Sequence, residues 1–252
     1  MLIGIKCPRT KKLADCQKCK SPCLPIPLMM SLLSDRELKP NEYHLTELSN
    51  PLRIAYLNRK YNYMVEISDV ENVWIGTAIH YYIAQFKHKD YIADPDTAGK
   101  VEIDKDVFIT LTPDLYDTKR KIIYDFKVVK TYEVEKIKKD GLDQKYLYQL
   151  NGYRAFKFPE AKKLILVFIL KDYTIRTKYE KDIESPFVEV EVPIIETAKE
   201  ELINKAKALH KALTENKPPE KCSPEESWDG KRCDFYCSVN KFCRELNNNG
   251  RV

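Results

Sequence analysis

The eight cysteines of this chain lie in two groups at its ends, and this distribution constrains the fold more than any other feature. The first group has the spacing C-x8-C-x2-C-x3-C and consists of Cys7, Cys16, Cys19 and Cys23. The second has the spacing C-x10-C-x3-C-x5-C and consists of Cys222, Cys233, Cys237 and Cys243. Cysteines that serve as core residues would be scattered along the chain, so this clustering needs another cause.

Each group of four thiols predicts a metal site. The N-terminus lacks the long apolar stretch and the cleavage site of a signal peptide, so we expect a cytoplasmic protein, where grouped cysteines read as metal ligands before disulfides. Four thiolates suit either tetrahedral zinc or an iron–sulfur cluster. The short Cys16–Cys19 knuckle is typical of zinc, whereas the C-terminal group is compatible with zinc or with a 4Fe-4S cluster. The alternative is that these are reduced structural thiols or disulfides.

Between the cysteine groups, the chain predicts one α/β body. Its 252 residues, of which 43% are hydrophobic and 32% charged, are enough to bury a core without disulfide support. The longest apolar run, 164–170, is too short to cross a bilayer, and we expect no membrane partner. The predicted division is an N-terminal metal-binding segment (1–40), a core (41–216) and a C-terminal metal-binding segment (217–252).

The predicted core mixes helices and strands. A short helix lies within 24–40, the next begins at Pro51, and a third opens at 74–77 with Ile79, Ile83 and Phe86 as a buried stripe. Strands over 107–111 and 121–129 form a hairpin through the turn 117–120. A helix (143–156), a doubly covered strand (163–170), a half-exposed strand (188–192) and a long helix (193–216) follow. This order predicts a mixed central β-sheet flanked by helices.

Charged side chains converge at the predicted hairpin. Asp114 ends one strand, and Asp125 and Lys127 lie two residues apart on the next, so they project from the same face. Two neighbouring carboxylates resist joint ionisation unless a cation lies between them, and Mg²⁺ or Mn²⁺ suits such ligands. A lysine beside a metal-bound water can orient it or offset charge on a phosphate. The alternative is an Asp–Lys pair on a solvated strand face.

Three residues on predicted helices extend this pattern. His80 could supply a nitrogen ligand, and Gln149 and Tyr153 share one helix face, with Tyr146 one turn earlier. Taken singly, such a histidine is usually a surface or core residue, and such tyrosines usually belong to the core. The prediction therefore depends on the order and spacing of the whole set.

The series Gly-x-x-x-His, Pro-Asp, Asp-x-Lys and Gln-x-x-x-Tyr resembles the motifs of the PD-(D/E)XK nuclease superfamily, over about residues 44–243. More narrowly, it is similar to the RecB-like branch that includes CRISPR-associated RecB-like exonucleases and exonuclease V. The resemblance implies a restriction-endonuclease-like core in which the metal ligands are His80, Asp114, Asp125 and the carbonyl of Phe126. It also implies that Lys127 acts on the attacking water, and that Gln149 and Tyr153 contact substrate or support the metal site.

The C-terminal cysteines extend the resemblance to the iron–sulfur members of this branch. Cys233, Cys237 and Cys243 match the three downstream cluster ligands, with x3 in place of the more usual x2. The upstream cysteine of the family is replaced by Pro51. Either Cys222 or an N-terminal cysteine supplies the fourth ligand, or the site holds zinc. The N-terminal quartet is an addition to the family pattern.

Together these features predict a Mg²⁺- or Mn²⁺-dependent deoxyribonuclease, an exonuclease acting on single-stranded DNA or DNA ends. The formal net charge of +5 permits a nucleic-acid partner. Basic residues that could follow a DNA backbone, or simply be solvated, are Arg53, Arg59, Lys60, Lys136, Lys138 and Lys139. The resemblance adds partner proteins of a CRISPR, recombination or viral replication system. The alternatives are a catalytically inactive nucleic-acid-binding or scaffold module, and an RNA- or nucleotide-directed hydrolase on the same fold.

Overall fold

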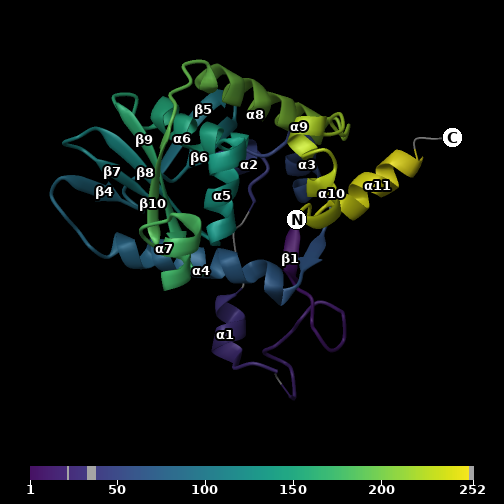
Figure 1. The fold of residues 1–252 in the computed structure, drawn as a ribbon. Helices are drawn as coiled ribbons and strands as arrows, with labels where there is room; N and C mark the ends of the chain where they lie inside the picture. Colours follow the sequence, from purple (N-terminus) through teal and green to yellow (C-terminus); the bar gives the residue numbers. More distant parts are fainter. Residues whose placement is uncertain (22, 33–37, 250–252) are drawn as a thin grey trace. The chain divides into compact units, whose positions relative to one another are not determined.

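The computed structural model describes residues 1–21, 23–32 and 38–249, and these residues form two compact units (Figure 1). The terminal unit comprises the described residues of 1–41 and 50–74 and the chain from Lys205 onward. The sheet unit comprises Glu42–Ser49 and Ile75–Asn204. Two of the four boundaries between the units fall within helix α4 (Ile67–Ala84) and helix α8 (Ala198–Thr214). The division predicted from the sequence consists of three consecutive segments. The terminal unit instead combines residues from both chain ends with residues 50–74.

The sheet unit is built on a five-stranded mixed sheet of order β10-β9-β8-β7-β4 (Figure 1). Its strands are β4 (Tyr91–Ala93), β7 (Leu115–Asp117), β8 (Ile122–Val129), β9 (Lys163–Leu170) and β10 (Phe187–Val192). The β8 and β9 strands are parallel, and the other pairs are antiparallel. As predicted, the apolar β9 lies inside the sheet with mostly buried side chains, while β10 alternates in exposure along one edge.

A three-stranded sheet of order β2-β6-β5 completes this unit, with strands β2 (Glu42–His44), β5 (Gly99–Asp104) and β6 (Val107–Leu111). Helix α6 (Gln144–Phe156) packs against β8, β9 and β10, and also against α2 (Leu45–Leu48). Helices α5 (Thr131–Asp140) and α7 (Ile175–Lys181) complete the sheet unit and were not predicted. Mixed sheets flanked by helices confirm the predicted α/β class.

The hairpin that builds the candidate site differs from the predicted one. The sequence predicts that 107–111 pairs with 121–129, but β6 pairs with β2 and β5 in the other sheet. The strand that forms the hairpin with β8 is β7, and its three residues are too few to show the alternation typical of a strand. The predicted turn is correct: Asp117 Oδ1 accepts hydrogen bonds from the backbone N–H groups of Lys119 (3.0 Å) and Arg120 (2.7 Å).

Four predicted helix features are wrong. Helix α4 begins at Ile67, ahead of the predicted start at 74–77, and Phe86 is 65% exposed, so it does not extend a buried stripe. Helix α8 begins at Ala198 instead of Pro193. Pro51 is the residue that caps helix α3 (Leu52–Lys60), one position before the predicted placement.

The terminal unit combines a parallel pair of short strands with short helices. Its strands are β1 (Leu2–Ile5) and β3 (Tyr63–Val65), and its helices are α1 (Ile26–Ser31), α3, α9 (Pro224–Ser227), α10 (Lys231–Phe235) and α11 (Asn240–Asn249). The predicted helix within 24–40 is α1 in part, and residues 33–37 of that prediction lie outside the described residues. Among the described residues, no helix is long and apolar enough to span a bilayer.

Close packing in the sheet unit gives a test of this fold. A Cβ atom at Gly152 of α6 would lie 2.6 Å from both δ-carbons of Leu45 and 3.0 Å from Cδ1 of Leu202. Because both leucines are fully buried, we expect Gly152→Ala to lower the free energy of unfolding by about 1–3 kcal/mol in urea denaturation.

The matched control for that variant is Gly76→Ala on α4. A Cβ at Gly76 would have no heavy atom within 4 Å. This change should therefore raise the free energy of unfolding by about 0.5–1 kcal/mol, the usual gain for alanine over glycine in a helix. Equal effects of the two substitutions would contradict the packing of α6 against α2.

Candidate active site

The structure brings the predicted site residues together inside the sheet unit. Asp114 directly precedes β7, and β8 carries Asp125, Phe126 and Lys127. His80 lies on α4, and α6 carries Gln149 and Tyr153. The register sets Leu115 opposite Tyr124, so the next pair along the hairpin is Asp114 and Asp125. The predicted proximity of the two aspartates is therefore found, although β7, and not β6, positions Asp114.

Both backbone groups of Phe126 hold side chains of the site. Its N–H donates to Asp114 Oδ2 at 2.7 Å, and its carbonyl lies 2.9 Å from His80 Nε2. A carbonyl oxygen only accepts, so Nε2 of His80 must carry the hydrogen. In the neutral ring Nδ1 is then an acceptor, and it lies 3.4 Å from Asp114 Oδ1.

The contact between His80 and Asp114 joins two neutral groups at pH 7. Burial lowers the pKa of His80, which favours the uncharged imidazole. Burial, followed by the neighbouring Asp125 carboxylate, raises the pKa of Asp114 to about 8. Without a bound cation, Asp114 is therefore mostly protonated at pH 7, and its carboxyl group can donate toward His80 Nδ1.

The carboxylate of Asp125 is fully buried and is held from two sides. Gln149 Nε2 donates to its Oδ1 at 3.0 Å, and the Lys127 ammonium forms an ion pair with its Oδ2. Despite that pair, Oδ2 accepts no properly aligned hydrogen bond from any described residue. The contact agrees with the prediction that Asp125 and Lys127 project from one face of the strand.

Gln149 and Tyr153 act on the site from within the core. The Nε2 atom of Gln149 lies 2.6 Å from the Tyr153 hydroxyl, and both side chains are buried. Their placement supports Asp125 and leaves little surface for substrate. Tyr146 belongs to the core: its hydroxyl lies 3.2 Å from Glu133 Oε1, and its ring packs edge-on against Phe168 at 5.8 Å.

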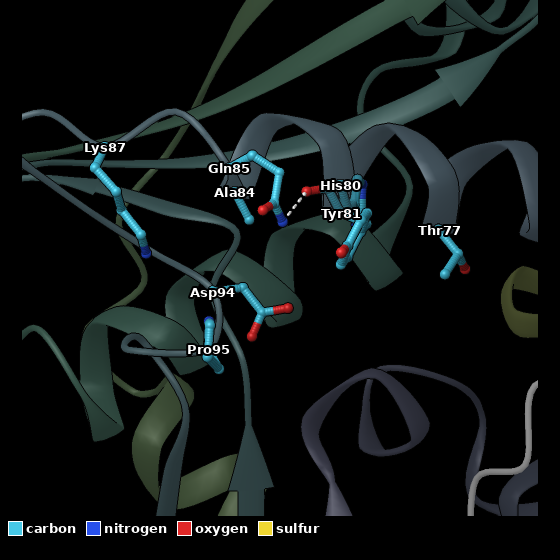
Figure 2. A pocket seen from close by; sticks show the side chains of 8 residues that line it. All are labelled: Thr77, His80, Tyr81, Ala84, Gln85, Lys87, Asp94 and Pro95. Atoms are coloured by element: carbon cyan, nitrogen blue, oxygen red, sulfur yellow. Dashed lines mark hydrogen bonds between the residues drawn. The ribbon is translucent and has the colours of Figure 1, made fainter.

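Asp94 is a further acidic residue at the site, and the sequence analysis missed it. It follows β4, and its N–H donates to the Asp114 carbonyl at 3.3 Å. Its carboxylate makes a smaller contribution to the raised pKa of Asp114, after burial and Asp125. Asp94 also lines a hollow of about 470 Å³ beside His80 (Figure 2). Asp94 belongs to none of the motifs in the sequence, and the proline that follows it is typical of a turn.

The described residues contain no ready-made metal cage. Within 1–21, 23–32 and 38–249, no three His, Cys, Asp or Glu side chains form a group that could hold a metal ion. The cysteines of each quartet are nevertheless neighbours. Burial raises the pKa of Cys222 to about 11, with Glu226, Cys233 and Cys243 adding to the rise. Burial likewise raises the pKa of Cys16, with smaller effects from Cys23, Cys19 and Cys7. Metal binding by either quartet stays a prediction.

Comparison with known proteins shows similarity at the level of the fold. Neither protein-family models nor curated protein sequences give a match. The crystal structure of SSO0001 is similar with a TM-score of 0.50 and 18% identity, over 82% of this chain and 88% of that one. An alkaline exonuclease from Laribacter hongkongensis is similar at a TM-score of 0.45 and 10% identity, over 77% and 95%. A phage-related exonuclease from Haemophilus somnus follows at 0.33 and 17%, over 58% and 70%. The likeness to SSO0001 shows a shared fold alone.

The raised pKa of Asp114 predicts a pH dependence of stability. In a chelating buffer, folded Asp114 keeps a proton that the unfolded chain, with an ordinary pKa of 3.8, releases. Folding therefore takes up a proton between about pH 4 and 8, and the free energy of unfolding falls as the pH rises through this range. Asp114→Asn keeps an acceptor for the Phe126 N–H and lacks this proton.

We expect Asp114→Asn to be more stable than wild type at pH 9 by at least about 1 kcal/mol, since one pKa unit corresponds to about 1.4 kcal/mol. The advantage should shrink as the pH is lowered toward 4. Urea denaturation in EDTA at several pH values measures both proteins, and their difference isolates Asp114 from other titrating groups. A difference that does not change with pH would contradict the raised pKa.

Proposed function

We propose that the sheet unit carries the active site of a divalent-metal-dependent nuclease that hydrolyses DNA phosphodiesters, at single strands or DNA ends. One observation carries the proposal: the mostly buried Asp114 and the fully buried Asp125 meet at one hairpin, beside an ammonium and an imidazole. Proteins rarely bury two neighbouring carboxylates without a purpose, because each raises the cost of ionising the other.

The donor chemistry of this site fits a hard cation. As they lie in this structure, His80, Asp114 and Asp125 do not yet form a metal-binding group. After a local rearrangement, these three side chains and the Phe126 carbonyl would be the ligands of Mg²⁺ or Mn²⁺. A protonated Asp114 and a buried Asp125 Oδ2 without an aligned hydrogen bond are both states that a cation would relieve. Such an ion would polarise the scissile phosphate and lower the pKa of a bound water. For Asp125 to bind it through Oδ2, the Lys127 ammonium must leave that oxygen.

The other side chains then have distinct roles. Lys127, once released from Asp125, would remain beside the reacting phosphate, where its ammonium can position the attacking water and offset negative charge in the transition state. Gln149 keeps Asp125 oriented through its hydrogen bond to Oδ1, and Tyr153 orients Gln149. His80 stays fixed by its Nε2 bond to the Phe126 carbonyl, which directs Nδ1 toward Asp114.

A second candidate is a nucleic-acid-binding or scaffold module without turnover. The Asp125–Lys127 ion pair favours it, because an ion pair of this kind also serves as a purely structural contact. An RNA- or nucleotide-directed hydrolase would use the same groups. DNA is the partner we propose, and partner proteins of a CRISPR, recombination or viral replication system rest on the motif resemblance alone.

For the cysteines we propose structural metal binding, with zinc at Cys7, Cys16, Cys19 and Cys23. An iron–sulfur cluster or zinc would occupy Cys222, Cys233, Cys237 and Cys243. All eight lie in the terminal unit and are free thiols. Metal binding there would contribute to folding of the two chain ends. Iron, zinc and labile sulfide content of anaerobically purified protein distinguishes the two metals.

The assay that tests the nuclease measures Mg²⁺- or Mn²⁺-dependent cleavage of labelled oligonucleotides. Lys127→Ala should lower the rate by about 10²- to 10³-fold, the usual effect of removing one group that stabilises transition-state charge. The matched control is Lys163→Ala on β9, which removes a lysine paired with Glu191 at 3.1 Å on the sheet surface and should keep the wild-type rate.

The substrates are single-stranded DNA, duplex DNA with free or blocked ends, and RNA. Equal rates for Lys127→Ala and wild type would remove Lys127 from the mechanism. DNA binding without cleavage of any substrate would favour the inactive module, and cleavage of RNA alone would favour the RNA-directed hydrolase.

A further inference from the structure

The hollow beside His80 has the volume and the lining side chains to receive a nucleotide, and this inference rests on the proposed nuclease function. We propose that it receives the nucleotide next to the scissile phosphate of a single strand, with Tyr81 stacking on the base. The lining residues are Thr77, His80, Tyr81, Ala84, Gln85, Lys87, Asp94 and Pro95, all in the sheet unit.

The position of the hollow ties it to the candidate active site. His80 forms part of its wall, and its Nδ1 lies 3.4 Å from Asp114 Oδ1. Figure 2 shows Tyr81, Gln85, Lys87 and Asp94 around the open space, with Gln85 Nε2 bonded to the Tyr81 carbonyl at 3.2 Å. A polynucleotide whose phosphate reached Asp114 and Asp125 would place a neighbouring nucleotide here.

The ring of Tyr81 is 70% exposed although it directly follows a site residue. Its helix neighbour Tyr82 is similarly exposed, at 65%, but packs edge-on against Phe86 at 5.1 Å and does not line the hollow. An exposed aromatic face beside a phosphodiester site is a platform on which any base can stack, independent of sequence.

The lining of the hollow carries one positive and one negative side chain, Lys87 and Asp94, and we expect them to orient the nucleotide. Lys87 is exposed and lies 3.5 Å from Asp96, in a surface pair that contributes little, so its ammonium can engage a phosphate instead. Asp94 is half-buried on the side that faces His80 and Asp114. Its carboxylate repels phosphate and accepts hydrogen bonds from a base amino group or a sugar hydroxyl. The phosphate therefore lies toward Lys87, and the base and sugar toward Asp94.

The volume of the hollow limits the substrate. About 470 Å³ lies in the range of small-molecule sites and suits one nucleotide. A base can present its face to Tyr81 only when it is unstacked from its strand neighbour and splayed away from any pairing partner. The subsite therefore selects single strands or frayed ends over intact duplex.

The test uses short single-stranded DNA with 2-aminopurine at each position in turn, in Ca²⁺ without Mg²⁺ or Mn²⁺. Stacking quenches 2-aminopurine fluorescence. Wild type and Tyr81→Phe should quench the probe most strongly at one position, and Tyr81→Ala should not. Tyr82→Ala is the matched control and should quench as wild type does.

Binding affinity in the same buffer supplies the second measurement. Tyr81→Ala should weaken binding about tenfold, as loss of one stacked base does. An abasic residue at the quenched position should weaken binding by wild type by a similar factor. It should weaken binding by Tyr81→Ala little, because both changes remove the same stacking interaction. Equal behaviour of Tyr81→Ala and Tyr82→Ala, an abasic effect that is unchanged in Tyr81→Ala, or no binding by wild type would each overturn the subsite.

These readings separate the subsite from the nuclease. Quenching and affinity need no turnover, and the surface control Lys163→Ala should quench the probe as wild type does. Quenching by a chain that never cleaves DNA would refute the nuclease, and Tyr81 would then be a base-stacking residue of a nucleic-acid-binding module. Cleavage that depends on Lys127, without quenching that depends on Tyr81, would refute the subsite alone.

Discussion

The hydrogen bond from the Phe126 N–H to Asp114 Oδ2 is the interaction on which the candidate site depends. The N–H and C=O of one strand residue point to the same side, and those of Phe126 point to where β7 has ended. The strand partner is missing there, so the Asp114 carboxyl and the His80 imidazole take its place. One residue of β8 thereby joins β7, β8 and α4 at a single point. The Asp117 turn fixes the register that makes this possible.

This arrangement accumulates negative charge where little water can screen it. The pKa of Asp114 is raised, so its carboxyl group keeps a proton, and the carboxylate of Asp125 forms an ion pair with Lys127. Both arrangements are reversible, because a divalent cation can replace the proton on Asp114 and the ammonium beside Asp125. The buried Gln149 and Tyr153 keep Asp125 in place during such an exchange, because their hydrogen bonds do not involve Oδ2. The site thus combines a fixed framework with replaceable positive charge.

The features that could be predicted from the sequence are those that depend on residues close together along the chain, and the features that were missed depend on distant residues. The shared face of Asp125 and Lys127, the apolar β9 and helix α6 follow from local periodicity, and all were predicted. The pairing of β8 with β7 was not, because β7 has three residues and β6 offered a longer candidate. Asp94 reaches the site through the pairing of β4 with β7, which leaves no local pattern. Burial of Gln149 and Tyr153 favours support of Asp125 over contact with substrate, and burial depends on the whole fold.

Manganese binding tests the central claim most directly. Titration of Mn²⁺, followed through the electron paramagnetic resonance signal of the free ion, should show uptake by wild type. The same titration should show no uptake at this site by the double variant Asp114→Asn/Asp125→Asn, which keeps the shapes of both side chains and removes both ionisable carboxyl groups. Equal uptake by the two proteins would contradict the account, because the ion would then bind elsewhere.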